Sequence, residues 1–487
     1  RFSITGCSLM TSSRTSQTCV SSRSTSFFAF LMFWEMPLLT SSFILVDTIM
    51  VGQLGDLSLS AVGMAGQFGW FLNMITFGMC SGAAVFISQY WGAKDTAGIR
   101  RTYGIAVVSV CLISALFFVI GLLFPEGVVR IFNREPDVVE AGAAYLRIAC
   151  WSYLATGVNM VFCIVLRSTE NVKLPMYVSL VTTVLNAFMD YGLIFGAFGM
   201  PEMGIRGAAL ATVISAWAGP VLILAVSAIQ RNMLISPIKE LFGFNKRSIA
   251  EYYEKATPVI INETLWGLGT LLFSVIFANL GYQYYAAVTI FRTFENIAFV
   301  FFIGLCNASS IMVGKNVGAG HIKRAVEDSR RFVLFVSLCS VLTGVLIIIF
   351  RFQLASVFNL SGSITPETLK LTASLLLVYG IELPMRNLPY ILIVGTFRPG
   401  GDTKIGMKLD LLSLWLCSVP LTTLAAFVFK LPFIAVFAIM YIAEDYLKVF
   451  LCVKYYFTYN WLRPVTDQGI KGLEEFYESR RKKPADQ

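Results

Sequence analysis

Residues 27–52 read FFAFLMFWEMPLLTSSFILVDTIMVG and decide the class of protein. The stretch is long and apolar enough to cross a bilayer core of about 30 Å, which takes about 20 helical residues. Near its far end it carries Asp47. A charge at this depth costs at least about 2.5 kcal/mol, so it is by default a functional candidate with a partner nearby. The sequence therefore predicts a membrane protein with a functional carboxylate in its first span.

The composition extends this interpretation to the whole chain. Hydrophobic residues make up 56% and charged residues 14% of the 487 positions, and the mean hydropathy is +0.71. These values lie far from those of soluble domains, and a chain of this length can hold about a dozen spans. The net charge of +9 comes from basic residues in short connections, which argues against a nucleic-acid partner. The ten cysteines show no metal-ligand spacing, so we expect no metal site built from them.

Apolar segments after the first span predict an all-α integral membrane fold of twelve transmembrane helices. Every second connection is basic, for example the one that carries Lys94, Arg100 and Arg101. Because basic connections stay on the cytoplasmic side, both termini are expected in the cytoplasm. The further helices are predicted at 60–88, 103–124, 142–167, 175–197, 206–229, 256–280, 284–312, 331–351, 368–396, 407–429 and 433–455.

The two halves of the chain repeat each other. A shift of 226 residues places Gly78 on Gly304 and Gly92 on Gly318 without a gap. Repeats with the same orientation predict two six-helix bundles related by a pseudo-twofold axis along the membrane normal. We expect a disordered Ser/Thr-rich leader (1–26), an N-terminal bundle (27–229), a cytoplasmic linker (230–255), a C-terminal bundle (256–455) and a cytoplasmic tail (456–487). The leader also has the composition of an organellar transit segment.

The first bundle holds one set of candidate site residues, Asp47, Asn159, Asn186 and Asp190. Asn186 and Asp190 are four positions apart and share one face of the fifth predicted helix. If these side chains converge, two carboxylates meet in a low dielectric, which favours holding a proton or binding a monovalent cation such as Na⁺. The alternative is that each acid only accepts hydrogen bonds from neighbouring helices.

The second bundle holds a separate polar set. An unpaired arginine at membrane depth is very costly, so Arg292 and Arg386 are each expected to face a glutamate. The set can act as a static ion-pair lock, or it can contact the substrate and take part in coupling. Asp410, Glu444, Asp445 and Lys448 are expected in solvated positions near helix ends. The candidate residues of this set are Asn262, Glu263, Arg292, Glu295, Glu382, Arg386 and Asn387.

Several chemistries have no motif in the sequence. No phosphate-binding GxxxxGK[ST] loop occurs, the single histidine is His321, and no nucleophile stands with a base. We therefore expect no enzyme activity and no cofactor. Any transport would take its energy from an ion gradient, which supplies about 2.3 kcal/mol per charge for each 100 mV.

Four sequence blocks together resemble the bacterial multidrug and toxic compound extrusion (MATE) antiporters, of the NorM and DinF kind. They are VDTIMVGQLGD (46–56), LNAFMDYGLIFG (185–196), PVIINETLWGLG (258–269) and GTFRPGGDTK (395–404). The resemblance covers 37–463 and implies a V-shaped, two-bundle exporter that exchanges protons or sodium for amphipathic, often cationic organic compounds. It also implies that Asp47, Asn186 and Asp190 belong to a proton or cation site.

The sequence thus predicts a monomeric, ion-coupled efflux antiporter of the cell membrane. Its partners would be small organic substrates, H⁺ or Na⁺, and the bilayer. A lipid-linked sugar flippase of the same architecture is the first alternative, although cations rather than acids are expected around its phosphates. A membrane receptor or scaffold that does not transport is the second, and it would be expected to carry a large ligand-binding loop.

Overall fold

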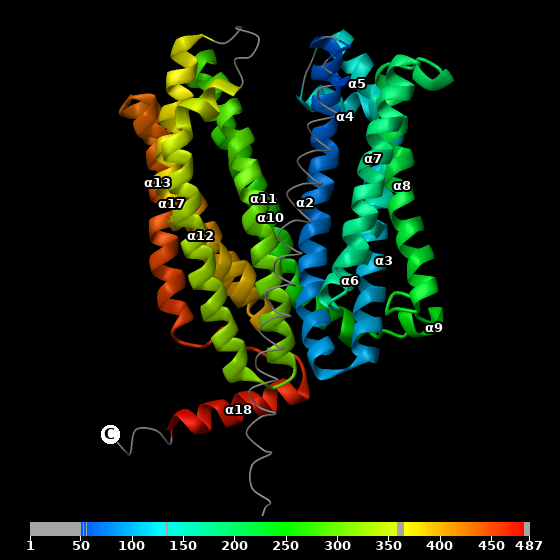
Figure 1. The fold of residues 1–487 in the computed structure, drawn as a ribbon, viewed down its shortest axis with the longest axis vertical. Coiled ribbons are helices and arrows are strands. Elements are labelled where there is room, and N and C mark those ends of the chain that lie inside the picture. Colours follow the sequence, from blue (N-terminus) through cyan, green and yellow to red (C-terminus); the bar gives the residue numbers. More distant parts are fainter. Residues whose placement is uncertain (1–49, 52, 55, 133–134, 358–364, 482–487) are drawn as a thin grey trace, which may run out of the picture.

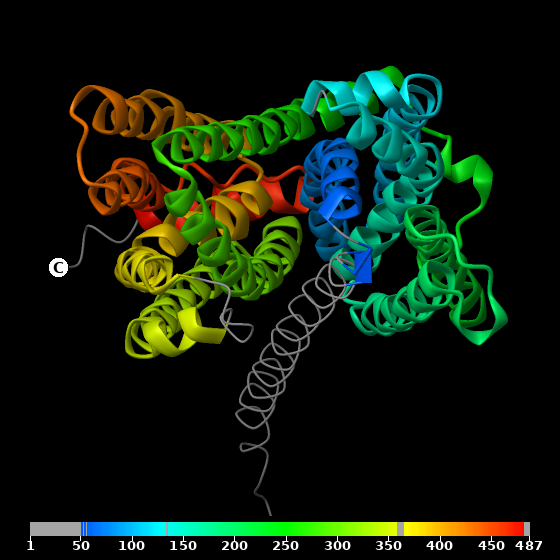
Figure 2. The same ribbon diagram turned by 90° about the horizontal axis from the view of Figure 1, so that it is seen from above.

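The computed structural model describes residues 50–51, 53–54, 56–132, 135–357 and 365–481. Helices dominate this part of the chain, and they form two groups that stand side by side (Figures 1 and 2). We call α2 to α8 the N-lobe and α10 to α17 the C-lobe. Asp47 and nearly all of the first predicted span lie outside the described residues.

The N-lobe is built from long apolar helices with local stop signals. The Asp95 carboxylate accepts a hydrogen bond from the Gly98 amide at 2.9 Å and caps α3. Gly196, at φ +69°, ends α7 in the left-handed conformation that glycine adopts without strain. The helices are α2 (Asp56–Ala93), α3 (Thr96–Leu123), α4 (Pro125–Phe132), α5 (Pro136–Ala149), α6 (Ser152–Ser168), α7 (Lys173–Phe195) and α8 (Ile205–Gln230).

The C-lobe follows the short helix α9 (Ile238–Leu241). Its main helices are α10 (Lys246–Leu280), α11 (Tyr282–Gly318), α12 (Ile322–Val357), α13 (Pro366–Leu392) and α17 (Phe433–Tyr456). Between α13 and α17 the chain forms α14 (Arg398–Gly400), α15 (Thr403–Leu411) and α16 (Val419–Thr423), joined by the π-helical segments Ile393–Phe397, Leu412–Ser418 and Leu424–Val428. The last helix, α18 (Asp467–Arg481), lies across one end of the molecule, which we call the α18 end (Figure 1).

The number of spans agrees with the two-lobe, twelve-helix prediction. Within the described residues, nine helices are long and apolar enough to cross a bilayer, or ten with the bent α5–α6 pair. Helix α17 is not among them because it carries Glu444, Asp445, Lys448 and Lys454, although the first three of these are buried.

Several segments differ from the predicted helices, and α4 and α9 were not predicted at all. The predicted helix 142–167 is two helices, α5 and α6, which meet at a bend of 50°. At this bend Ser152 donates a hydrogen bond to the Ala149 carbonyl at 2.6 Å, a side-chain bond that competes with the helical pattern. Helix α10 begins at Lys246, inside the predicted linker, where Asn245 caps it. The predicted tail contains α18.

The two lobes touch through a contact that the pseudo-twofold axis explains. A side chain added at Gly92 of α2 would collide with the Lys315 carbonyl of α11, and one added at Gly318 would collide with the Gln89 carbonyl. The shift of 226 residues relates Gly92 to Gly318 and Gln89 to Lys315, so the contact occurs twice, as twofold symmetry requires. This crossing agrees with the predicted pseudo-twofold relation and joins the lobes near the α18 end.

Candidate functional site

Helix α7 presents a polar face to the N-lobe interior and an apolar face outward. Thr182, Asn186 and Asp190 follow at four-residue intervals, and the last two are only 1% and 0% exposed. The opposite face is exposed and apolar, which suits contact with lipid. It consists of Tyr177, Leu180, Val181, Val184, Phe188 and Tyr191. The amphipathic pattern of α7 therefore turns Asn186 and Asp190 into the lobe.

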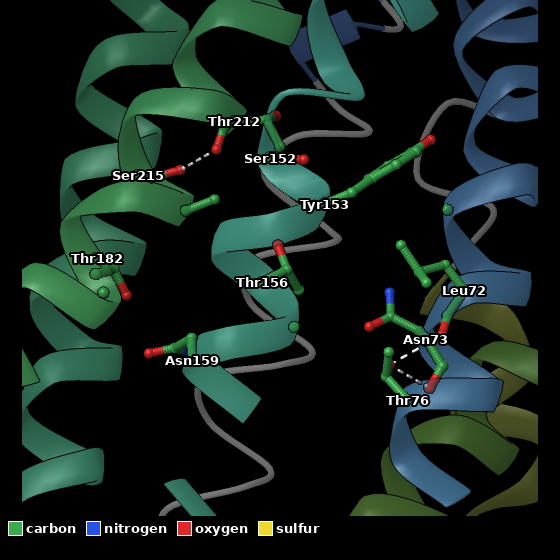
Figure 3. A pocket seen from close by; sticks show the side chains of 14 residues that line it. Leu72, Asn73, Thr76, Ser152, Tyr153, Thr156, Asn159, Thr182, Thr212 and Ser215 are labelled. Atoms are coloured by element: carbon green, nitrogen blue, oxygen red, sulfur yellow. Dashed lines mark hydrogen bonds between the residues drawn. The ribbon is translucent and has the colours of Figure 1, made fainter. Parts of the chain in front are cut away.

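A cavity of about 310 Å³ lies inside the N-lobe. Figure 3 shows Thr156 and Asn159 on α6, Thr182 on α7, and Asn73 and Thr76 on α2 around it. Asn159 points to α8, where a Cβ added at Gly219 would lie 3.0 Å from its Oδ1 atom. Within the described chain, this oxygen has no hydrogen-bond partner. The rest of the lining is Gly69, Leu72, Ser152, Tyr153, Gly157, Thr212, Ser215, Ala216 and Gly219.

The cavity lining is polar but carries no carboxylate, lysine or arginine among the described residues. The structure thus brings Asn159 to the cavity and places Asn186 and Asp190 one and two helical turns beyond Thr182 on the same buried face. Hydroxyl and amide groups can bind many ligands without fixing their charge. The predicted meeting of Asp47 with Asp190 falls outside the described residues and stays a prediction.

The C-lobe holds paired charges. Arg386 of α13 forms an ion pair with Glu295 of α11 at 3.1 Å, which confirms the pairing predicted for this arginine. The Tyr441 hydroxyl donates to Glu295 at 3.0 Å, and its ring lies 4.9 Å from the Arg386 guanidinium carbon. Asn387 donates to the Ser340 hydroxyl at 3.0 Å. Glu382 is 5% exposed, and its Oε2 atom has no hydrogen-bond partner among the described residues.

The prediction that Arg292 faces a glutamate is wrong. This arginine donates to the Thr270 carbonyl at 3.4 Å, and no carboxylate of the described chain forms an ion pair with it. Glu263 instead pairs at 2.7 Å with Arg398, which the sequence placed in a basic loop. Arg398 is only 4% exposed and directly follows the π-helical segment Ile393–Phe397. It also reaches Ser81 of α2 at 3.5 Å and so lies where the lobes meet.

A second cluster surrounds Lys448 of α17. Its ammonium group lies 2.9 Å from Asp410 and 2.8 Å from Glu444, and Asn262 donates to Asp410 at 3.0 Å. Asp445 is 1% exposed, and its Oδ2 atom has no hydrogen-bond partner in the described residues. Solvated positions were expected here, and this expectation is wrong because these side chains face the lobe interior.

Sequence reasoning missed some of these residues although a signal existed. Tyr441, Glu444, Asp445 and Lys448 follow the i, i+3, i+4, i+7 spacing of one helix face, on a helix whose other residues are mostly apolar. A polar stripe of this kind indicates burial against other polar groups. The cavity residues Thr76, Thr156 and Thr182 gave no such signal, because threonine is common in membrane spans.

The architecture and this polar interior define a multi-pass helical membrane protein with two lobes. The MatE family model matches residues 35–192 and 258–424, one match for each lobe. The chain therefore belongs to the MatE family, a family of membrane transporters.

Known relatives and structures agree with this assignment. The probable multidrug resistance protein NorM of Thermotoga maritima is 26% identical over 434 residues, which cover 88% of this chain and 91% of the relative. The NorM protein of Rhizobium meliloti is 27% identical over 79% of this chain and 82% of its own length. In fold, a crystal structure of the Vibrio cholerae MATE transporter VcmN is similar, with a TM-score of 0.78, 21% identity, and coverage of 96% of this chain and 99% of that chain.

Proposed function

We propose that this protein is a secondary active exporter that exchanges protons or sodium ions for amphipathic, often cationic organic compounds. The observation that carries the proposal is Asp190, a carboxylate with no exposed surface on the inward face of α7, two turns from the end of a polar cavity. Asp47, Asn159 and Asn186 complete the proposed cation or proton site. Two relatives described as probable multidrug resistance proteins support the choice of substrates.

The proposed coupling follows from the cost of burying charge. Ionising Asp190 at a position with no exposed surface is costly, and a proton, a sodium ion or a cationic substrate can each offset that cost. If only one of them is held at a time, loading the ion releases the substrate. The cavity lined by Asn73, Thr156 and Asn159 would hold part of the substrate by uncharged hydrogen bonding, which suits a broad range of compounds.

The proposed orientation places the α18 end in the cytoplasm. Lys94 follows α2, Lys315 and Lys323 flank the α11–α12 connection, and Lys404 lies in the first turn of α15, all at this end. Positive residues of short connections stay on the cytoplasmic side. In the C-lobe, Asn262, Glu263, Glu295, Glu382, Arg386 and Asn387 are proposed to set the shape of the lobe interior through their pairs, and Arg292 to adjoin the substrate path.

The test is uptake of a fluorescent organic cation into everted vesicles under a pH gradient or a sodium gradient imposed separately. Wild-type protein is expected to respond to one of the two gradients. Asp190→Asn should reduce gradient-driven uptake at least about tenfold, since an amide cannot carry the coupled charge. Asp137→Asn is the matched control, because Asp137 is an exposed acid of the same lobe. Unchanged gradient-driven uptake in Asp190→Asn would refute the proposed site, and uptake that neither gradient drives would refute the exchange.

A further inference from the structure

A basic pocket of about 450 Å³ lies at the α18 end of the C-lobe, away from the polar interior. Its walls come from the first turns of α15, the end of α17, the connection to α18, and α18 itself. Lys404, Lys408 and Arg463 are the cations of the lining, and Asp402 is its one acid. The lining thus has an excess of positive charge.

Asp402 offsets one of the three positive charges, and both of its oxygens are engaged by the protein rather than turned toward a ligand. It is 2% exposed; its Oδ2 atom accepts from the Tyr455 hydroxyl at 2.6 Å and pairs with Arg463 at 3.1 Å. Its Oδ1 atom caps α15 through the Ile405 amide. The acid therefore acts as a buried support that orients Arg463, whose side chain remains 51% exposed.

The two lysines are available to a ligand. Lys404 pairs with Glu254 at 2.7 Å, but both side chains are about half exposed, and such a surface pair holds its partners weakly. Lys408 is exposed and forms no ion pair with any described residue. One arginine and two lysines that line the same pocket can together bind a phosphate group.

The depth and the surroundings of the pocket point to a lipid. Lys404, Lys408 and Leu412 follow at four-residue intervals on α15 and its continuation, and Leu412 and Leu416 are 40% and 70% exposed. The lysines lie at the start of a membrane-spanning segment, Thr403–Val428, where headgroups are found. The leucines further along are exposed where acyl chains would run.

The pocket is also built rather than accidental. The Arg463 amide donates to the Gly400 carbonyl at 2.7 Å, and Leu462 pairs with Gly401 in a β-bridge. The next residues reach both lobes: the Val465 amide donates to Gln89 of α2 at 2.8 Å, and Thr466 donates to the Gly318 carbonyl of α11 at 2.6 Å. A ligand in the pocket would therefore bind a segment that ties the lobes together.

We propose that this pocket binds the phosphate headgroup of an anionic phospholipid, with an acyl chain along Leu412 and Leu416. The lipid bridges α15 and the connection before α18, and it stabilises that connection in place. The proposal concerns a lipid site outside the transport path and does not depend on which ion or compound is exchanged.

The test is native mass spectrometry of the purified full chain with added phosphatidylglycerol or phosphatidylcholine. Lys404→Gln/Lys408→Gln is compared with Lys323→Gln/Arg324→Gln, which removes the same charge from exposed residues at the same end. Wild type and the control pair should bind phosphatidylglycerol with about thirtyfold higher affinity than the pocket variant. Lys408→Gln alone should lower the affinity about fivefold relative to wild type. Phosphatidylcholine should bind all of them equally weakly.

Three results would overturn the proposal. They are equal phosphatidylglycerol retention in the pocket and control variants, equal retention of the two lipids by wild type, and displacement of the lipid by inorganic phosphate at equal concentration. The last result would indicate a site for free phosphate. If the double variant does not fold, the single variant Lys408→Gln decides the matter, because Lys408 holds no ion pair in the described structure.

Discussion

The interiors of the two lobes accommodate buried polar groups in different ways. The N-lobe surrounds a cavity with uncharged hydroxyl and amide groups and buries Asp190 beyond it. The C-lobe binds its charges to one another, as in the Arg386–Glu295 pair and the contacts of Lys448. The two repeated halves of the chain thus have different interiors. The comparison suggests that the N-lobe is suited to exchanging ligands and the C-lobe to holding its shape.

The largest effect should come from removing the cation of the Lys448 cluster. Lys448→Met would leave Asp410, Glu444 and Asp445 close together without that positive charge, and breaking a buried pair costs about 3–5 kcal/mol. The measurement is the free energy of unfolding in detergent micelles. Asp190→Asn is the comparison in the N-lobe, where we expect a change below about 1 kcal/mol because an amide of nearly the same size and shape replaces the buried acid. Equal losses in the two variants would remove the difference between the lobes.

A smaller loss is expected at the junction between the lobes. Arg398→Met should destabilise by about 3 kcal/mol, because Glu263, whose side chain is only 15% exposed, then loses its partner. The double variant Arg398→Met/Glu263→Gln should recover more than half of this loss, since no lone charge is left. Thermal unfolding of both variants measures the recovery. A double variant as unstable as the single one would show that packing, not charge pairing, holds this contact.

Filling the N-lobe cavity should affect transport more than stability. Gly219→Ala places a methyl group against Asn159, and helix propensity favours alanine by about 1 kcal/mol, which offsets the tight contact. We expect Tm to change by no more than a few degrees, about 2–4 °C per kcal/mol. Vesicle uptake of a bulky organic cation should fall severalfold. Unaltered uptake for bulky and small cations alike would argue that the substrate does not use this cavity.

The smallest effect is expected on the outer face of α7. Val184→Ala changes a side chain that is 62% exposed, and lipid can fill the space, so stability should change by less than about 0.5 kcal/mol. Asn186→Ala, which changes a residue of the buried face two positions further on, should reduce uptake. Val184→Ala should transport normally. A loss of uptake in Val184→Ala would contradict the assignment of this face to lipid.

The junction between the lobes shows how far the repeat in the sequence could predict the structure. Gly92 and Gly318 are related by the shift of 226 residues, and so are Gln89 and Lys315. In the structure Gly92 lies against Lys315, and Gly318 lies against Gln89. The pairing of Arg386 was also predictable, because an arginine in an apolar helix requires an acid. Which acid it meets was not, since Glu295, Glu263 and Glu382 all satisfied the same requirement.

The sequence by itself determined that this chain is a helical membrane protein with two repeated halves, because long apolar runs and their spacing depend only on local composition and bilayer thickness. It also determined that Asn186 and Asp190 share a helix face. Only the tertiary structure decided that Arg398 is buried and forms an ion pair with Glu263, and that the polar face of α17 points into the lobe. It also decided that threonines of α2, α6 and α7 surround one cavity. These outcomes depend on how whole helices rotate and bend against each other, and several partners of equal chemistry compete for each buried group.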